Sequence, residues 1–159
     1  MNHKLGIPNE KDLDFILPDK NRRGQRAYAV IECFQKIPCD PCYFSCPVKA
    51  IREFKDINDL PKIDYEKCTG CGLCISLCPG LAIFLVNESN PDFDVVTLPY
   101  EFIPLPKKGD TIWGLNRMGE EICKGEVMNV RKGKHKTTVV TIKIEKEYGN
   151  KVRFFKVIK

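Results

Sequence analysis

The distribution of cysteines constrains this chain more than any other feature of its sequence. Eight of the nine lie between Cys33 and Cys78, and only Cys123 falls outside that stretch. They form two runs that each end in Cys-Pro, with spacings C-x5-C-x2-C-x3-C-P and C-x2-C-x2-C-x3-C-P. Thiols at this density are joined to one another or bound to metal, and either outcome fixes the backbone around them.

The rest of the sequence favours metal binding over disulfides. The first ten residues contain no apolar stretch or cleavage site typical of a secretory signal, so we expect a cytoplasmic protein. The longest apolar run, Leu81–Val86, is far shorter than the ~20 residues of a membrane span. Closely spaced cysteines in a reducing compartment stay reduced and serve as metal ligands.

The two cysteine runs are copies of one pattern. An offset of 32 residues superposes the last three cysteines of each run together with the residues that follow them. The superposed pairs are Cys39/Cys71, Cys42/Cys74, Cys46/Cys78, Pro47/Pro79, Ala50/Ala82 and Ile51/Ile83. We therefore predict one duplicated domain over residues 27–88.

The remainder of the chain divides into three further stretches. Residues 1–26 are polar and contain two prolines, which predicts an N-terminal arm with little regular structure. Residues 89–108 contain four prolines and read as an extended linker, because proline interrupts helices and central strands. Residues 109–159 hold four β-like runs separated by turns, which predict a small antiparallel sheet or barrel.

The positive charge of the chain is concentrated near its C-terminus. Residues 1–90 have no net charge, whereas residues 91–159 hold fourteen Lys and Arg against nine Asp and Glu. We expect the C-terminal β module to be a docking surface that is not needed to build the metal sites. Cys123, inside a predicted strand, reads as a small buried apolar residue.

The second cysteine run, Cys68 to Pro79, resembles the bacterial two-cluster [4Fe–4S] ferredoxins. Gly70 and Gly72 would let the loop approach a cluster closely. The resemblance implies an α+β, ferredoxin-like duplicated domain with two [4Fe–4S] clusters and crossed ligation. It assigns Cys33, Cys39, Cys42 and Cys78 to one cluster and Cys68, Cys71, Cys74 and Cys46 to the other. The five-residue gap after Cys33 departs from the usual two.

A zinc ribbon is the alternative metal site. Two C-x2-C knuckles, Cys39/Cys42 and Cys71/Cys74, would supply its four ligands. It would leave four cysteines and both Cys-Pro pairs without a role, so the sequence favours iron–sulfur clusters.

These features indicate electron transfer without an independent active site. No nucleotide-binding glycine motif or nucleophile elbow occurs. The additions around the cysteine domain resemble iron–sulfur subunits of multisubunit oxidoreductases, including flavin-dependent amino-acid or imino-acid dehydrogenases, which implies a flavoprotein partner. A free soluble ferredoxin and an iron–sulfur nucleic-acid-binding protein are the alternatives. The second rests on the net charge of +8 over residues 122–159.

Overall fold

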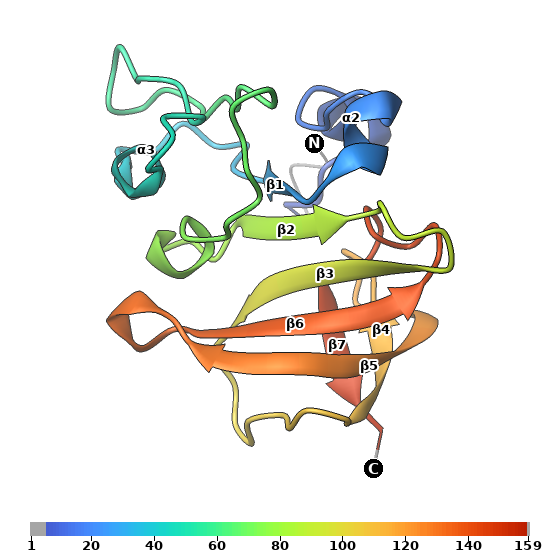
Figure 1. The fold of residues 1–159 in the computed structure, drawn as a ribbon. Coiled ribbons are helices and arrows are strands. Elements are labelled where there is room, and N and C mark those ends of the chain that lie inside the picture. The colour runs from blue at the N-terminus through green and yellow to red at the C-terminus, as the bar shows by residue number, and fades with distance from the viewer. Residues whose placement is uncertain (1–5, 159) are drawn as a thin grey trace.

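The fold is a single antiparallel sheet of seven strands with a few short helices (Figure 1). The computed structural model describes residues 6–158. The strands are β1 (Tyr28–Ile31), β2 (Ile83–Asn87), β3 (Phe93–Tyr100), β4 (Thr111–Leu115), β5 (Glu121–Lys132), β6 (Thr138–Glu145) and β7 (Phe154–Val157), in the order β1-β2-β3-β6-β5-β4-β7. The helices are α1 (Glu10–Asp14), α2 (Lys20–Gln25) and α3 (Pro41–Ser45), with 3-10 turns η1 (Ile75–Leu77) and η2 (Lys134–Lys136). The prediction of a small antiparallel sheet is confirmed.

The C-terminal part of the sheet curls around its own apolar core. In the sheet order three strands separate β3 from β7, yet Tyr100 of β3 stacks on Phe154 and Phe155 of β7 at ring distances of 5.6 and 5.3 Å. The buried residues inside this curl are alternating members of the strands, such as Val96, Leu98, Ile142 and Ile144. Alternation places one face of each strand inward, as expected for a sheet with a single dry face. Cys123 is buried in this core, as predicted.

The interpretation of residues 89–108 as a linker is wrong for their central part. β3 occupies Phe93–Tyr100 and pairs along its whole length with β6. β2 pairs with β3 only at residues 95–97, so Pro99 has a single strand neighbour. A proline is tolerated in such a locally one-sided position, because its missing N–H can face the open side.

The N-terminal arm also has more regular structure than predicted. Asn9 caps α1 by accepting from the Asp12 N–H, and Asp19 caps α2 by accepting from the Arg22 N–H. Both are side-chain N-caps, a signal that is present in the sequence. Buried Arg22 then donates to the carbonyl oxygens of Tyr65 and Cys68 at 2.9 and 2.8 Å. The arm is therefore attached to the loop that precedes the second cysteine run.

Two buried polar networks join the C-terminal strands to the cysteine-bearing half. Glu32, directly after β1, accepts from Arg117 and Arg153. Glu88, directly after β2, accepts from Arg23, from the Tyr28 hydroxyl and from the amide of Asn150. Together with the pairing of β3 and β6, these contacts make residues 109–158 continuous with the rest of the fold and not a separately attached module.

None of the described helices is long and apolar enough to cross a bilayer.

Candidate metal centre

One group of four cysteines gathers around the start of α3. Cys33 follows β1, Cys39 precedes α3, Cys42 lies within it, and Cys78 follows η1 from the second run. Burial, together with the negative charges of Cys78, Cys39 and Cys33, raises the pKa of Cys42 to about 11. Burial and the charge of Cys78 also raise the pKa values of Cys33 and Cys39. These four thiols are close enough to repel one another when ionised, and Cys33 lies among them despite its long spacing.

The other four cysteines form a second group. Cys68, Cys71 and Cys74 belong to one loop, and Cys46 reaches it from the end of α3. Burial, together with the charges of Cys68, Cys71 and Cys46, raises the pKa of Cys74 to about 12. All four also line one cavity, whose other walls include Ala29, Ala50, Ile51, Ile63 and Leu85. The two groups are the two sets that the resemblance assigns to separate clusters.

Matching backbone contacts surround the last cysteine of each run. The N–H of Ala50 lies 3.2 Å from Cys46 Sγ, and that of Ala82 lies 3.4 Å from Cys78 Sγ. Lys49 and Leu81, the residues just before these donors, adopt positive φ angles of 50° and 52°. Both pairs are related by the 32-residue offset of the sequence repeat. An N–H directed at sulfur stabilises negative charge on a thiolate.

The strand contacts beside the two runs follow the same offset. Ile31 pairs with Ile83, and Ile63 pairs with Ile51 in an isolated antiparallel bridge. The Glu32 N–H donates to Ala82 O at 2.8 Å, and the Asp64 N–H donates to Ala50 O at 2.7 Å. These contacts are thus related in pairs by the 32-residue offset.

Gly70 and Gly72 shape the loop of the second run. Both have positive φ, 70° and 74°, a region that disfavours side chains. A Cβ at Gly70 would lie 2.6 Å from the carbonyl oxygen of Ala27. Glycine at position 70 therefore lets the cysteine loop pack directly on the backbone that leads into β1.

In the described part of the chain, no three His, Cys, Asp or Glu side chains converge closely enough to hold one metal ion. A tetrahedral zinc site needs its sulfurs within ~2.3 Å of the ion. A four-iron cluster takes one thiolate at each of four corners, and each group supplies four thiols.

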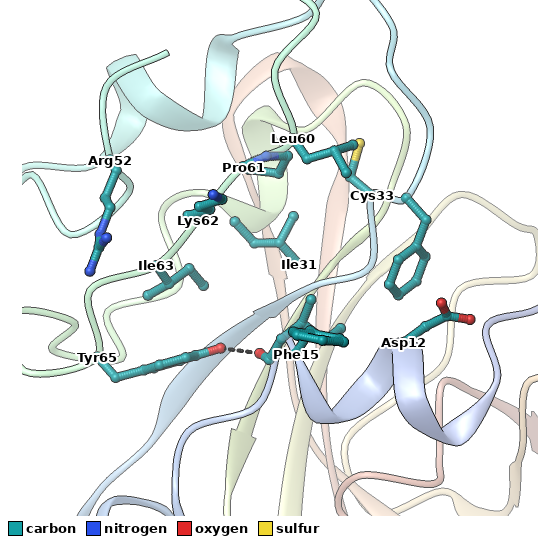
Figure 2. Close-up of a pocket in the computed structure, with 12 residues that line it drawn as sticks. Asp12, Phe15, Ile31, Cys33, Arg52, Leu60, Pro61, Lys62, Ile63 and Tyr65 are labelled. Atoms are coloured by element: carbon teal, nitrogen blue, oxygen red, sulfur yellow. Dashed lines mark hydrogen bonds between the residues drawn. The ribbon is translucent and has the colours of Figure 1, made fainter. Parts of the chain in front are cut away.

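An open groove flanks the first group. The groove has a volume of ≈ 650 Å³, and Cys33 is among its lining residues. Figure 2 shows it between the end of α1 and residues 60–65. Phe15 lies at its edge with 91% of its surface exposed. The hydroxyl of Tyr65 donates to the carbonyl oxygen of Ile16 and closes one end (Figure 2). One side of the first cysteine group is therefore accessible from the surface.

Sequence reasoning missed one element of the second group's surroundings. The turn between β5 and β6 packs on η1, inside the second cysteine run (Figure 1). Gly133 permits this contact, because a Cβ there would lie 2.4 Å from the Cβ of buried Ser76. The only sequence signal is a glycine within a run of basic residues, which also suits an ordinary exposed turn.

Comparison with known proteins identifies the cysteine region. The 4Fe–4S binding domain matches residues 61–84. Pyruvate synthase subunit PorD of Methanocaldococcus jannaschii is 46% identical over 73 residues, which are 45% of this chain and 83% of that protein. The chain belongs to the family of 4Fe–4S binding-domain proteins.

Two further relatives match this chain over only part of their own length. A component of the ion-translocating oxidoreductase complex of Methanosarcina acetivorans is 42% identical over 44% of this chain and 25% of its own length. NADH-quinone oxidoreductase subunit I of Pelobacter propionicus is 31% identical over 54% of this chain and half of its own length. No solved structure matches the chain significantly. The chain is thus an iron–sulfur protein of electron transfer, homologous to subunits of multisubunit oxidoreductases.

Proposed function

We propose that this protein holds two [4Fe–4S] clusters and relays single electrons within an oxidoreductase complex. The observation that carries the proposal is the division of eight thiols into two groups of four. Cys33, Cys39, Cys42 and Cys78 would bind one cluster, and Cys68, Cys71, Cys74 and Cys46 would bind the other. The fourth thiol of each group belongs to the opposite cysteine run, so cluster binding would connect the two runs.

The matching contacts around the two runs support a duplicated, ferredoxin-like arrangement of residues 27–88. Hydrogen bonds to sulfur, positive φ angles and strand bridges recur at the 32-residue offset. Recurrence of irregular features, such as a non-glycine residue at positive φ, is a stronger indication than recurrence of ordinary strand geometry, because such residues are uncommon. Two equivalent backbones would present two equivalent ligand sets.

The residues around each cysteine group would affect the reduction potential of a bound cluster. When bound, a [4Fe–4S] cluster supplies reversible one-electron chemistry. The apolar walls of the cavity at the second cysteine group exclude water. The Ala50 and Ala82 N–H groups stabilise negative charge on Cys46 and Cys78. Water exclusion and hydrogen bonding to sulfur are the two means by which a protein adjusts the potential of such a centre.

The partner we propose is a flavoprotein oxidoreductase, and an amino-acid or imino-acid dehydrogenase is the class we favour. A reduced flavin can release its two electrons one at a time, which suits two one-electron acceptors. The relatives named above are subunits of complexes, which supports a subunit role. We further propose that the complex is cytoplasmic.

Iron content and magnetic resonance test the two-cluster proposal directly. We expect the anaerobically purified or reconstituted protein to contain about eight iron atoms per chain and to show two interacting paramagnets after reduction with dithionite. About four iron atoms in a fully reconstituted sample, or bound zinc, would contradict it. Co-purification of a flavin-containing chain would test the partner independently.

A further inference from the structure

The turn between β5 and β6 carries a concentrated positive charge. Residues 131–136, here called the basic hairpin, read Arg-Lys-Gly-Lys-His-Lys and contain no acidic residue. All five basic side chains are exposed. None has a hydrogen bond or ion pair from its side chain to another described residue, although acidic residues such as Glu32, Glu88 and Asp94 are paired with other cations. The positive charge of this turn is therefore left unneutralised by the rest of the described fold.

The basic hairpin lies directly on the second cysteine run. η2 of the hairpin contacts η1, and Gly133 packs against Ser76. On the other side, the Arg131 guanidinium comes within 3.7 Å of the position that a Cβ would take at Gly72. Gly72 stands between Cys71, which is exposed, and Leu73, which is 41% exposed. The charged turn thus borders the part of the second cysteine group that reaches the surface.

We propose that the basic hairpin is the docking surface for an acidic electron-carrier protein, which it would hold against the exposed loop at Cys71. This inference rests on the proposed electron-transfer function. A patch of one charge sign steers an oppositely charged protein and orients it on contact. Bringing the carrier to the most exposed thiol shortens the path to its redox centre. One electron would then pass to the carrier, with no bond made or broken.

The same charges could attract nucleic acid, but the hairpin lacks the other parts of such a site. Binding of single strands uses aromatic side chains on which bases stack. Residues 131–136 contain no Phe, Tyr or Trp, and the aromatic group of Tyr100, Phe154 and Phe155 packs within the curled sheet. A protein partner with an acidic face needs only the charge and the exposed loop, which are both present.

Charge reversal on the hairpin tests the proposal. The probe is an acidic plant-type [2Fe–2S] ferredoxin in its oxidised state, and the readout is its dissociation constant from calorimetric titration at 50 mM salt. We expect Lys132→Glu/Lys134→Glu to weaken binding at least ~10-fold. We also expect 500 mM salt to abolish wild-type binding, because the Debye length then falls well below 10 Å.

The matched control is Lys107→Glu/Lys108→Glu. These lysines are also exposed and produce the same change of net charge, but they lie in the loop before β4, at the bottom of Figure 1. We expect their reversal to change the dissociation constant less than ~3-fold. The rate at which the reduced protein passes one electron to the ferredoxin should follow the same order across the variants.

Several outcomes would overturn the docking inference. They are no binding of the ferredoxin by the wild type, equal losses in the two double variants, or full affinity after reversal of the hairpin. If Lys132→Glu/Lys134→Glu lost binding to a single-stranded RNA oligonucleotide but kept full affinity for the ferredoxin, the hairpin would be a nucleic-acid site instead. Iron content and visible absorption separate the docking site from the proposed function. A protein without clusters contradicts the proposed function, whereas a cluster-loaded protein that fails these tests contradicts only the docking site.

Discussion

Arg153, just before the last strand, donates from its guanidinium to the carboxylate of Glu32, just after the first strand. Both side chains are largely buried, and Arg117 completes the site with an Nε–Oε2 distance of 2.9 Å. Burial opposes ionisation of Glu32, but the two guanidinium groups outweigh it and lower its pKa. The carboxylate next to Cys33 is therefore held as an anion by two arginines that are 85 and 121 residues away in the sequence.

Removing the charge of Glu32 should destabilise the protein strongly. Glu32→Gln leaves Arg153 buried without a counter-charge, and such changes cost about 3–5 kcal/mol. For a protein of this size we expect the midpoint of thermal unfolding to fall by about 10 °C. The control is Glu121→Gln, which removes the exposed partner of Lys156 and should cost less than about 1 kcal/mol. Similar shifts for both variants would contradict the structural role of Glu32.

A second prediction concerns Gly70, which lies inside the second cysteine run, and uses Gly80, just after the run, as its control. Gly70→Ala introduces a Cβ at positive φ and 2.6 Å from Ala27 O, so it should cost at least about 1–3 kcal/mol and displace the loop. Gly80→Ala is the control, because no atom lies within 4 Å of its added Cβ and its φ is not positive. Iron analysis should show a loss confined to Gly70→Ala. Retention of all iron by that variant would mean that the close approach is not required.

Crossed ligation predicts which cysteine supports which centre. Cys78→Ala should disrupt the centre built mainly by the first run, and Cys46→Ala should disrupt the one built mainly by the second. Each variant should lose about half of the bound iron, while Cys123→Ala, buried in the sheet core, should lose none. Site-resolved spectra of the reduced variants distinguish the two centres. If Cys78→Ala spared the centre containing Cys39 and Cys42, the grouping would be wrong.

The network at Glu88 predicts a pH dependence. Burial raises the pKa of Glu88, but hydrogen bonds from Arg23 and Tyr28 outweigh it and leave the pKa below its ordinary value of 4.5. A lowered pKa in the folded state gives stability that is complete above pH 4.5 and is lost as the pH falls through the lower folded value. The difference in thermal midpoint between wild type and Glu88→Gln should be constant from pH 6 to 8 and should shrink below pH 4.5. A difference that widened in acid would contradict this assignment.

Shortening the chain also has a predictable effect. A chain ending at Pro106 keeps all eight cysteines of the two groups but loses β6, the neighbour of β3, and both arginines that pair with Glu32. The sequence alone predicts that the metal sites survive this truncation. The structure favours the opposite result, a chain that is prone to aggregate through the exposed edge of β3 and retains little iron. Recovery of a monomer with full visible absorption would instead support the prediction from sequence.

The parts of the fold that sequence predicted are those governed by local patterns. Alternating runs located the last four strands, and the 32-residue repeat located both cysteine runs. The prediction failed for α1 and α2, whose N-caps were not used, and for β3, because its stretch was assigned as a linker from its four prolines although Pro99 has only one strand neighbour. The Glu32 site could not be anticipated, since Arg117 and Arg153 are distant in sequence and carry no motif. The same is true of the hairpin on η1, whose contact depends on Gly133 and Ser76.

The long separation between Glu32 and Arg153 has a consequence for synthesis of the protein. Ribosomes add about 5–20 residues per second, so ~75 residues beyond Cys78 require about 4–15 seconds. During that interval all eight thiols have been made, but Arg153, one of the two arginines that pair with Glu32, has not. A cofactor delivered during translation would therefore meet a protein in which Glu32 lacks part of its ion pairing. That pairing would become complete only after Arg153 has been synthesised.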